Sequence, residues 1–365
     1  MLKKLRYLLA TLLALLVLLA AIDVFTYDRD AWRRDYTQLK RGMAQGYANL
    51  DWIASQRQLD LPALDRATIA KLDNSVSHVQ GFFAIRGFVR TFNDPHLRLA
   101  WGKRPAQSVT LSTWHLDKEE DSPEPAEPPV ASCKDAGYED GKHAFVLPVA
   151  DLPGWREQSA GPFAAGVVGT TGILRIAQLG EDRYLTQCES VFTPGLTSSQ
   201  LKLKVRAALQ RELEARLREL KAAGVVRLVV DVTGNGGGTE WVDEVIALFT
   251  DRTLTRSAVR AVAPACDRSG IWRGEKVCPA LIPSGVDQVL QGRGVWTGPL
   301  LVLADRRTGS AAEDFVVWLK ENNVATVLGE RTAGAGCGYV NGGHVSVLQA
   351  SRFDVKMPNC ARYLR

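Results

Sequence analysis

Two stretches of the chain repeat one pattern of hydrophobic and polar positions. A mainly apolar run leads into a glycine-containing turn, and apolar residues then recur at helical spacing, first over 227–249 and again over 299–319. Apolar runs of this kind are typical of strands buried on both faces of a parallel sheet. Each stretch therefore predicts a strand, a turn and an amphipathic helix, and this periodicity assigns the chain to the α/β class.

Helical spacing also governs two longer ranges. Residues 31–92 are predicted to form a helical subdomain that ends at Asn93, and residues 198–223 one long amphipathic helix that Gly224 terminates. Between these ranges, residues 119–129 are acidic and proline-rich. Such a composition buries too little apolar surface to order itself, so we expect an exposed loop or linker there.

The first residues have the pattern of a membrane-targeting segment. Lys3, Lys4 and Arg6 precede an uncharged, leucine-rich run, and apolar residues continue to Phe25. As a helix, this run would extend about 28 Å, close to the ~30 Å hydrocarbon core of a bilayer. We expect residues 1–26 to be a signal anchor that tethers an exported body on the periplasmic or extracellular side of the membrane. A cleaved signal peptide is the alternative, although the candidate cleavage sites are poor.

Export fits the cysteine content. An even number of cysteines in a chain that leaves the cytoplasm predicts disulfides. Two pairings are favoured, Cys266–Cys278 around a glycine-containing insert and Cys337–Cys360 around the final hairpin, although six cysteines allow fifteen pairings. The candidates are Cys133, Cys188, Cys266, Cys278, Cys337 and Cys360.

Composition argues against several classes of function. The net charge is only +5 over 365 residues, and no basic tract follows the first six residues. Nucleic acid is therefore not an expected partner. The sequence has no C-x-x-C pair, no cysteine–histidine group with zinc-ligand spacing and no nucleotide-binding motif. We expect neither a metal nor another cofactor.

Ser310 is the first candidate for chemistry, because it stands where the second predicted strand ends and its helix begins. Free N–H groups and the helix dipole at that place stabilise negative charge on a substrate oxygen, which suits a nucleophilic serine. The loop Gly234–Gly238 follows the other strand, and parallel strands bring both loops to one edge of the sheet. The alternative is structural, since Ser310-Ala-Ala-Glu313 also fits a capping box.

Four motifs follow one another along the chain. They are Asn93-Asp-Pro-His96, Leu228-Val-Val-Asp-Val-Thr-Gly-Asn-Gly-Gly-Gly238, Thr308-Gly-Ser-Ala-Ala-Glu313 and Gly329-Glu-Arg-Thr-Ala-Gly334. In this order they resemble the tail-specific, or C-terminal-processing, serine peptidases, and the resemblance extends from about Tyr36 to the end of the chain. Each motif alone is weakly specific, whereas the ordered set of four is fairly specific.

The resemblance implies an architecture. Residues 171–365 would form a crotonase- or Clp protease-like core of ββα units, preceded by the helical subdomain at 27–100 and a connector at 101–170. Many relatives insert a peptide-binding PDZ domain near the connector. Without its acidic run this connector is too short, and it lacks a carboxylate-binding glycine loop. We therefore expect no complete PDZ domain.

The resemblance also indicates the base. One branch of the family uses a lysine in the loop after the Gly-Glu motif, but Ala335 occupies that position here. Lys320 lies ten residues along the helix from Ser310, about 15 Å away, and cannot replace it. The chain is then closer to the tricorn-like branch, in which a histidine at the position of His96 is the base. Pro95 replaces the serine that precedes this histidine in that branch, and a purely structural turn histidine is the alternative.

For the oxyanion hole we expect the N–H of Ala311 together with that of Gly236 or Gly237. The glycines also suit a tight turn with positive φ, and both roles are compatible. Glu330 and Asp94 are possible orienting acids. An exposed carboxylate at a strand end is the structural alternative for Glu330.

Tricorn-like relatives continue beyond the position of Arg365 to a glutamate of the catalytic set. No carboxylate side chain follows Asp354 in this sequence. Loss of the orienting acid of a serine protease lowers kcat by ~10⁴. If these residues are a fragment, we expect it to fold but to hydrolyse peptides feebly. If they are the whole natural product, a binding role gains ground, unless Glu330 or Asp94 replaces the missing acid.

The sequence therefore predicts an exported, membrane-tethered serine peptidase. It would hydrolyse peptides or protein C-terminal segments through an acyl-enzyme at Ser310, without metal or cofactor. The alternative is a catalytically silent relative that binds peptides or other ligands, and a hydrolase of another ester or amide is a weaker third possibility. Cleavage specificity and oligomeric state do not follow from the sequence.

Overall fold

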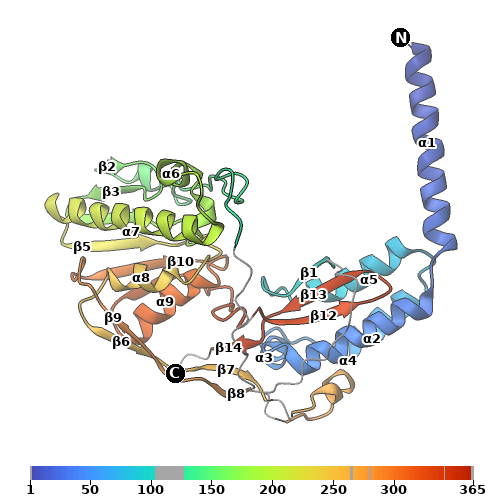
Figure 1. Ribbon diagram of the computed structural model, residues 1–365. Helices are drawn as coiled ribbons and strands as arrows, with labels where there is room; N and C mark the ends of the chain where they lie inside the picture. Colours follow the sequence, from blue (N-terminus) through green and yellow to red (C-terminus); the bar gives the residue numbers. More distant parts are fainter. Residues whose placement is uncertain (1, 103–126, 264–265, 279–280, 341, 363–365) are drawn as a thin grey trace. The chain divides into compact units, whose positions relative to one another are not determined.

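The computed structural model describes residues 2–102, 127–263, 266–278, 281–340 and 342–362 (Figure 1). The chain divides into two compact units, each built from segments that are distant in sequence. Unit 1 comprises Met1–Lys103, Val259–Gly285 and Cys337–Arg362. Unit 2 comprises Arg104–Ala258, Val286–Gly336 and Tyr363–Arg365.

A six-stranded sheet organises unit 2. Its strand order is β11-β10-β5-β4-β3-β2. The pairs β11–β10, β10–β5 and β5–β4 are parallel, whereas β4–β3 and β3–β2 are antiparallel. The strands are β2 (Arg156–Ser159), β3 (Ala165–Val168), β4 (Thr171–Arg175), β5 (Arg227–Asp231), β10 (Leu300–Ala304) and β11 (Thr326–Gly329).

Helices α7, α8 and α9 lie along one face of this sheet (Figure 1). The parallel strands follow one another across the sheet in chain order, so right-handed crossovers place their connecting helices on the same side. The bounds are Ser198–Ala222 for α7, Trp241–Ala247 for α8 and Ala311–Glu321 for α9. The other elements of unit 2 are η1 (Val149–Asp151), η2 (Glu181–Arg183), α6 (Leu185–Val191) and the antiparallel pair β6 (Thr253–Arg256) and β9 (Gln288–Gln291).

The elements predicted around the two glycine loops are present. The first stretch forms β5 and α8, and the second forms β10 and α9. Leu228, Val230 and Val302 of the central strands are buried, as their apolar runs require. Gly224 terminates α7 with a φ of 81°. The mixed α/β class is confirmed, and the finer description as a core of ββα units stays a prediction.

Unit 1 contains the predicted helical subdomain. Asp28, Asp60 and Ser77 cap three of its helices, each accepting a hydrogen bond from a backbone N–H of the first turn. The buried side chains of Trp32 and Phe88 are among the largest in its core. The helices are α1 (Leu2–Phe25), α2 (Arg29–Gly46), α3 (Leu50–Gln56), α4 (Leu61–Asp73) and α5 (His78–Thr91).

Two small antiparallel sheets complete unit 1, with strand orders β1-β13-β12 and β14-β7-β8. Helix α2 packs on β12 through Gly42 and Gly46, whose missing side chains leave room for Ser346 and His344. The elements are β1 (Arg98–Trp101), β7 (Val259–Val262), η3 (Ser269–Arg273), β8 (Leu281–Ser284), β12 (His344–Leu348), β13 (Phe353–Met357) and β14 (Cys360–Ala361).

The segments 259–285 and 337–362 pack with the helices of unit 1, although the sequence division placed them in the 171–365 core. Arg268 shows the cause for the first segment. Its fully buried guanidinium donates to the carbonyl oxygens of Met43, Ala44 and Tyr47. These carbonyls lie at the end of α2, where a helix leaves acceptor capacity for partners outside it. The second segment contributes β13, which pairs with β1.

All six cysteines are paired. The disulfides are Cys133–Cys188 in unit 2 and Cys266–Cys278 and Cys337–Cys360 in unit 1. Both pairings favoured by the sequence are therefore present. Three disulfides are consistent with an oxidising compartment.

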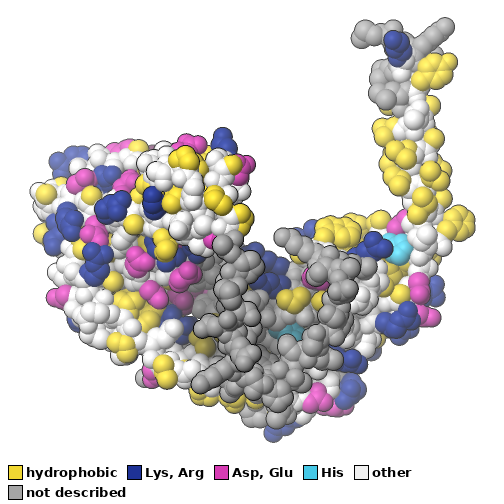
Figure 2. All heavy atoms as spheres, viewed as in Figure 1, with side chains coloured by type: hydrophobic (Ala, Val, Ile, Leu, Met, Phe, Trp, Pro, Cys, Tyr) yellow, Lys and Arg dark blue, Asp and Glu magenta, His cyan; other side chains and the backbone are white. Residues whose placement is uncertain are grey.

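Helix α1 coincides with the predicted signal anchor. Among the residues searched, no single helix combines the length and hydropathy of a membrane span, whereas Leu9–Phe25 and Arg29–Gly46, bent by 71°, do so as a pair. Large apolar side chains along α1 are exposed (Figure 2). Membrane tethering stays a prediction, and most of the acidic, proline-rich range lies outside the described residues.

We predict that Gly46→Ala destabilises unit 1, because the new Cβ would lie 2.1 Å from Cγ of His344. Such overpacking costs about 1–3 kcal/mol. Gly87→Ala is the matched control, since nothing lies within 4 Å of its added Cβ in α5. The control should gain about 0.5–1 kcal/mol from the higher helix propensity of alanine. Urea denaturation measures both, and equal stabilities would contradict the close packing of α2 on β12.

Candidate active site

Ser310 lies at the turn between β10 and α9, in a backbone conformation that side chains disfavour. Its φ is 53° and its ψ is −129°, a sparsely populated region that costs residues other than glycine about 1–3 kcal/mol. Serine nucleophiles of α/β hydrolases occupy strained strand-to-helix turns of this kind, because the turn exposes the hydroxyl. The Ser310 side chain makes no capping hydrogen bond to α9, so this role does not occupy its hydroxyl.

Glu313 does not form a capping box with Ser310. Its buried carboxylate instead accepts hydrogen bonds from the loop that follows β11. The donors are Thr332 Oγ1 at 2.5 Å, Gly334 N at 3.1 Å and Ala335 N at 2.5 Å. The structural alternative for the Ser310 motif is therefore wrong. Glu313 anchors the loop after β11, a role that the sequence motif did not reveal.

The glycine-rich loop after β5 packs directly against the Ser310 turn. A Cβ atom added to Gly237 would lie 2.6 Å from Ser310 Cβ and 2.8 Å from Ala311 N, and the φ of Gly237 is 104°. Only glycine meets both demands. The Gly309 amide also donates to the Asn235 carbonyl oxygen at 3.1 Å. The structure thus brings Ser310, Gly237 and Ala311 together.

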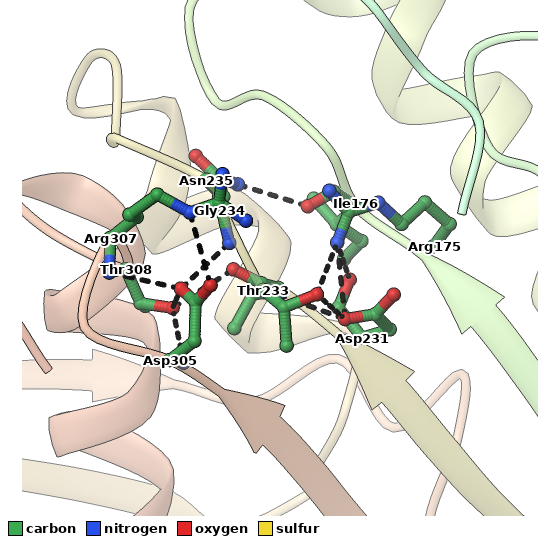
Figure 3. A network of polar contacts seen from close by, with 10 residues as sticks. Arg175, Ile176, Asp231, Thr233, Gly234, Asn235, Asp305, Arg307 and Thr308 are labelled. Carbon is green, nitrogen blue, oxygen red and sulfur yellow. Dashed lines mark hydrogen bonds and ion pairs between the residues drawn. The ribbon is translucent and has the colours of Figure 1, made fainter. Parts of the chain in front are cut away.

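The two candidate glycines differ in their amide hydrogen bonds. The Gly237 amide donates to Oδ1 of Asn235 at 2.9 Å. The Asn235 side chain in turn donates to the Ile176 carbonyl oxygen at 3.0 Å (Figure 3). Within the described part of the chain, the backbone amides of Gly236 and Ala311 donate no hydrogen bond. These two amides are therefore available to bind an oxyanion, whereas that of Gly237 is occupied.

A buried ion pair supports the end of β5. Asp231 is fully buried and accepts hydrogen bonds from both the amide and the hydroxyl of Thr233. The buried guanidinium of Arg175 lies 3.1 Å from the same carboxylate oxygen and also contacts Thr233 (Figure 3). A buried ion pair adds little net stability, because desolvation of the two charges offsets their attraction, but removal of one partner is strongly destabilising. The pair therefore acts mainly to fix the start of the glycine loop.

Asp305 links the two loops from the end of β10. One carboxylate oxygen accepts from Gly234 N at 2.8 Å, Arg307 N at 3.0 Å and Thr308 Oγ1 at 3.2 Å (Figure 3). Burial acts to raise the pKa of Asp305, but the hydrogen bonds from Gly234 and Arg307 hold it below its ordinary value. The group is therefore ionised at neutral pH. These structural roles of Asp231 and Asp305 were not predicted from the sequence. The available signal was an aspartate at the end of each predicted strand.

His96 follows α5 in unit 1, in a turn that Asp94 holds. One oxygen of Asp94 accepts from the His96 amide at 2.8 Å, and the other accepts from Tyr47 Oη and Asn49 Nδ2. Only 6% of His96 is exposed. Asp94 therefore holds a turn in which the histidine is buried.

The imidazole of His96 is suited to accept a proton. Its Nδ1 is buried and has no hydrogen-bond partner in the described ranges. Burial lowers the pKa of His96 below its ordinary value of 6.5, while the charge of Asp94 raises it in part and Arg98 lowers it further. The ring is therefore neutral near pH 7.

The two possible orienting acids have different surroundings. Asp94 is buried, and three donors engage its oxygens, so it acts on the His96 ring through its charge. Glu330 follows β11 in unit 2, is largely exposed and lies 3.7 Å from Arg306 Nε. An orienting role for either carboxylate stays a prediction.

The candidate residues are divided between the two units. His96 and Asp94 belong to unit 1. Unit 2 holds the others, Gly236, Gly237, Ser310, Ala311 and Glu330. A reaction in which His96 activates Ser310 therefore stays a prediction, supported by the surroundings of His96 in unit 1 and those of Ser310 in unit 2. Over the residues that were searched, no group of three or more His, Cys, Asp or Glu side chains could hold a metal ion.

Unit 2 also contains a cavity of about 670 Å³ away from the catalytic candidates. Mainly apolar side chains line it, including Phe145, Leu147 and Trp155, and none of the catalytic candidates does. His143 is part of the wall and has a buried Nδ1 without a hydrogen-bond partner among the described atoms. The cavity is large enough for a small ligand or an apolar side chain.

The strained Ser310 and the glycine-rich loop lie together at one edge of the sheet. Residues 171–341 match the model of peptidase family S41. The S41 match includes Ser310 and both glycine loops, spans slightly less than half of the chain, and supports a peptidase hydrolase. No curated protein matches the chain.

Solved structures with a similar fold align over most of the chain. Mature CPAF complexed with lactacystin is 15% identical, with a TM-score of 0.55 and alignment over 90% of this chain and 89% of that one. Mature CPAF is 14% identical over 92% and 89%, also with a TM-score of 0.55. The photosystem II D1 C-terminal processing protease is 18% identical over 91% and 86%, but its TM-score of 0.38 is too low to support an argument. The CPAF structures show the fold that this chain shares.

We predict that Ser310→Gly is more stable than Ser310→Ala by roughly 0.5–2 kcal/mol. Glycine removes a strain of about 1–3 kcal/mol but adds about 0.5–1 kcal/mol of backbone entropy to the unfolded chain. Ser199 in the first turn of α7 is the control, because its helical backbone is unstrained. There alanine should be more stable than glycine. Thermal unfolding of the four variants measures this, and the same order at both sites would contradict a strained Ser310.

Proposed function

We propose that the chain is a serine peptidase that hydrolyses peptides or protein C-terminal segments through an acyl-enzyme at Ser310. The strained backbone of Ser310 carries the proposal, because it presents the hydroxyl beside the unoccupied Ala311 amide at the start of α9. The S41 match supports a peptide or protein as the substrate. The reaction requires no metal or cofactor.

His96 serves as the base in this mechanism. As Ser310 Oγ attacks the scissile carbonyl carbon, its proton passes to His96 and the carbonyl electron pair moves onto the oxygen. The Ala311 and Gly236 amides donate to this oxyanion, and losing one such donor typically costs ~10²–10³ in rate. The intermediate then expels the amine, which takes the proton from His96. In the second half, water attacks the acyl carbon and gives a proton to His96. The Ser310 Oγ–carbon bond then breaks, Oγ takes the proton back from His96, and the acid is released.

A histidine base places the chain closer to the tricorn-like branch than to the branch that uses a lysine. Ala335 occupies the lysine position, and its amide donates to Glu313. Lys320 is exposed in the last turn of α9. Both observations support His96 as the base.

We also propose that the peptidase is exported and tethered through α1. The exposed apolar side chains of α1 and the three disulfides support this placement. Alkaline extraction of membranes tests the tether. Release of the full-length chain by this treatment would contradict it.

A catalytically silent, ligand-binding protein is the second candidate. The unpartnered Nδ1 of His96 favours it, because a histidine without an orienting acid is a poor base. The apolar cavity beside Trp155 would supply a binding site. Covalent labelling of Ser310 by a fluorophosphonate separates the two functions, since only an activated serine reacts.

We predict that Ser310→Ala and His96→Ala each lower peptide hydrolysis by about 10⁴-fold or more, and that the double variant loses little beyond either single variant. The two groups act as one unit, so their effects are not additive. Lys320→Ala is the control and should keep full activity. Steady-state kinetics of the four variants provides the measurement. Full activity in His96→Ala would eliminate His96 as the base.

We predict an acidic limb of the kcat/KM profile with a midpoint below pH 6.5. The base must be neutral, and burial lowers the pKa of His96 while Asp94 partly raises it. Activity should therefore rise with pH through this lowered pKa. Asp94→Asn removes the charge that raises the pKa and should shift the midpoint further toward acid. An unchanged midpoint in Asp94→Asn would contradict the electrostatic role of Asp94.

A further inference from the structure

Packing contacts, rather than a hydrogen bond at Nδ1, surround the imidazole of His96. Its Nδ1 has no partner among the residues that the structure describes. The backbone is held on both sides, since Asp94 accepts from the His96 amide and Tyr339 Oη donates to the His96 carbonyl oxygen at 2.5 Å. The residues packed around the ring therefore decide its orientation.

Gly338 and Tyr339 form one wall around this ring. A Cβ added to Gly338 would lie 3.1 Å from both Nε2 and Cε1 of His96, so the Gly338 backbone contacts the imidazole closely. The ring of Tyr339 makes an edge contact, with centroids 5.4 Å apart. Lys356 Nζ lies 4.1 Å from the centre of the Tyr339 ring. The wall is thus formed by two consecutive residues and supported from behind.

The wall is fastened on both of its sides. The preceding residue, Cys337, is bonded to Cys360, which is buried in β14 and pairs with Ala261 of β7. On the other side, Val340 exchanges two hydrogen bonds of 2.9 Å with the side chain of Asn359. The disulfide is the covalent one of these two attachments.

We propose that the Cys337–Cys360 disulfide is a positioning element for His96, so that efficient hydrolysis requires this cystine. The expected effect on the rate of hydrolysis rests on the proposed function, whereas the expected effect on the position of the His96 ring does not. Without the bond, the wall keeps only noncovalent contacts, through Asn359, Lys356 and the Tyr339 hydroxyl, and becomes more mobile beside the imidazole. A displacement of about 1 Å of a catalytic group costs on the order of 10²-fold in rate.

The other two disulfides lie elsewhere. Cys266–Cys278 also belongs to unit 1, but it closes the insert that carries Arg268. Cys133–Cys188 belongs to unit 2. The Cys266–Cys278 pair therefore provides a matched control, because its removal also deletes one disulfide from unit 1 while leaving the wall at His96 intact.

The test compares Cys337→Ser/Cys360→Ser with Cys266→Ser/Cys278→Ser, both as the full chain with its remaining disulfides verified by mass spectrometry. We expect the first variant to lose roughly 10- to 100-fold in kcat with little change in KM. The control variant should keep kcat within about twofold. Equal kcat in the wild type and the first variant would overturn the proposal, as would an equal loss in both variants.

Gly338→Ala keeps the test decisive where the first variant fails to fold. Its added Cβ would press on Nε2 and Cε1 of His96 without altering any cystine. It should lower kcat to a similar extent, with Gly87→Ala as a control that keeps full kcat. A Gly338→Ala enzyme with unchanged kcat would show that the wall does not position the ring.

A readout without turnover separates this proposal from the proposed function. The His96 ring protons can be followed by NMR through a pH titration, with assignment by comparison with His96→Ala. Loss of the Cys337–Cys360 bond should shift the His96 midpoint, whereas loss of Cys266–Cys278 should not. A shifted midpoint in a chain without peptidase activity would refute the proposed function and keep the positioning role. Identical midpoints in all three proteins would refute the positioning role.

Discussion

Strands β5 and β10 pair in parallel, with Leu303 opposite Asp231, so both strands end at one edge of the sheet. Everything at the Ser310 turn depends on this register. It brings the carboxylate of Asp305 to the Gly234 amide and the Gly309 amide to the Asn235 carbonyl. A slip of one residue would reverse the faces of every side chain in the strand and separate the two loops. The sheet therefore determines how the two loops meet beside Ser310.

The strained conformation of Ser310 persists because its neighbours over-determine it. The hydroxyl of the neighbouring Thr308, for example, donates to the Val232 carbonyl oxygen and accepts from the Asp305 amide. A hydrogen bond of this type contributes about 0.5–1.5 kcal/mol, so a few of them offset a strain of about 1–3 kcal/mol. Gly237 completes the arrangement, since any side chain there would collide with Ser310. Backbone strain at one partly buried serine, offset by the contacts of its neighbours, is a reason to assign function to that residue.

Local features of the fold could be predicted from sequence, because apolar runs, turn residues and nearby cysteines are local signals. Strands β5 and β10, the start of α9 beside Ser310 and the Cys266–Cys278 pair belong to this class. The packing of Arg268 on α2 could not be predicted from sequence, because its acceptor, the carbonyl of Ala44, lies 224 positions away in the chain. The occupied amide of Gly237 could not either, since it depends on the orientation of one asparagine side chain. The Ser310-Ala-Ala-Glu313 pattern did not reveal whether Glu313 caps the helix, because its hydrogen-bond partners come from the loop after β11.

His96 shows why burial alone does not identify a base. Burial also lowers the pKa of His143 and His344. For each such group the unfolded chain binds a proton at higher pH than the folded one, so its contribution to stability is lost as pH falls below 6.5. An unpartnered buried nitrogen adds a cost of about 1–3 kcal/mol. His96 differs from the other two in burial, because it is buried whereas His143 and His344 are partly exposed. Hydrogen bonds to Asp94 and from Tyr339 also hold its backbone in a turn. In the proposed mechanism this buried imidazole is the proton acceptor, and its neighbours Asp94, Gly338 and Tyr339 surround it closely enough to define where the ring lies.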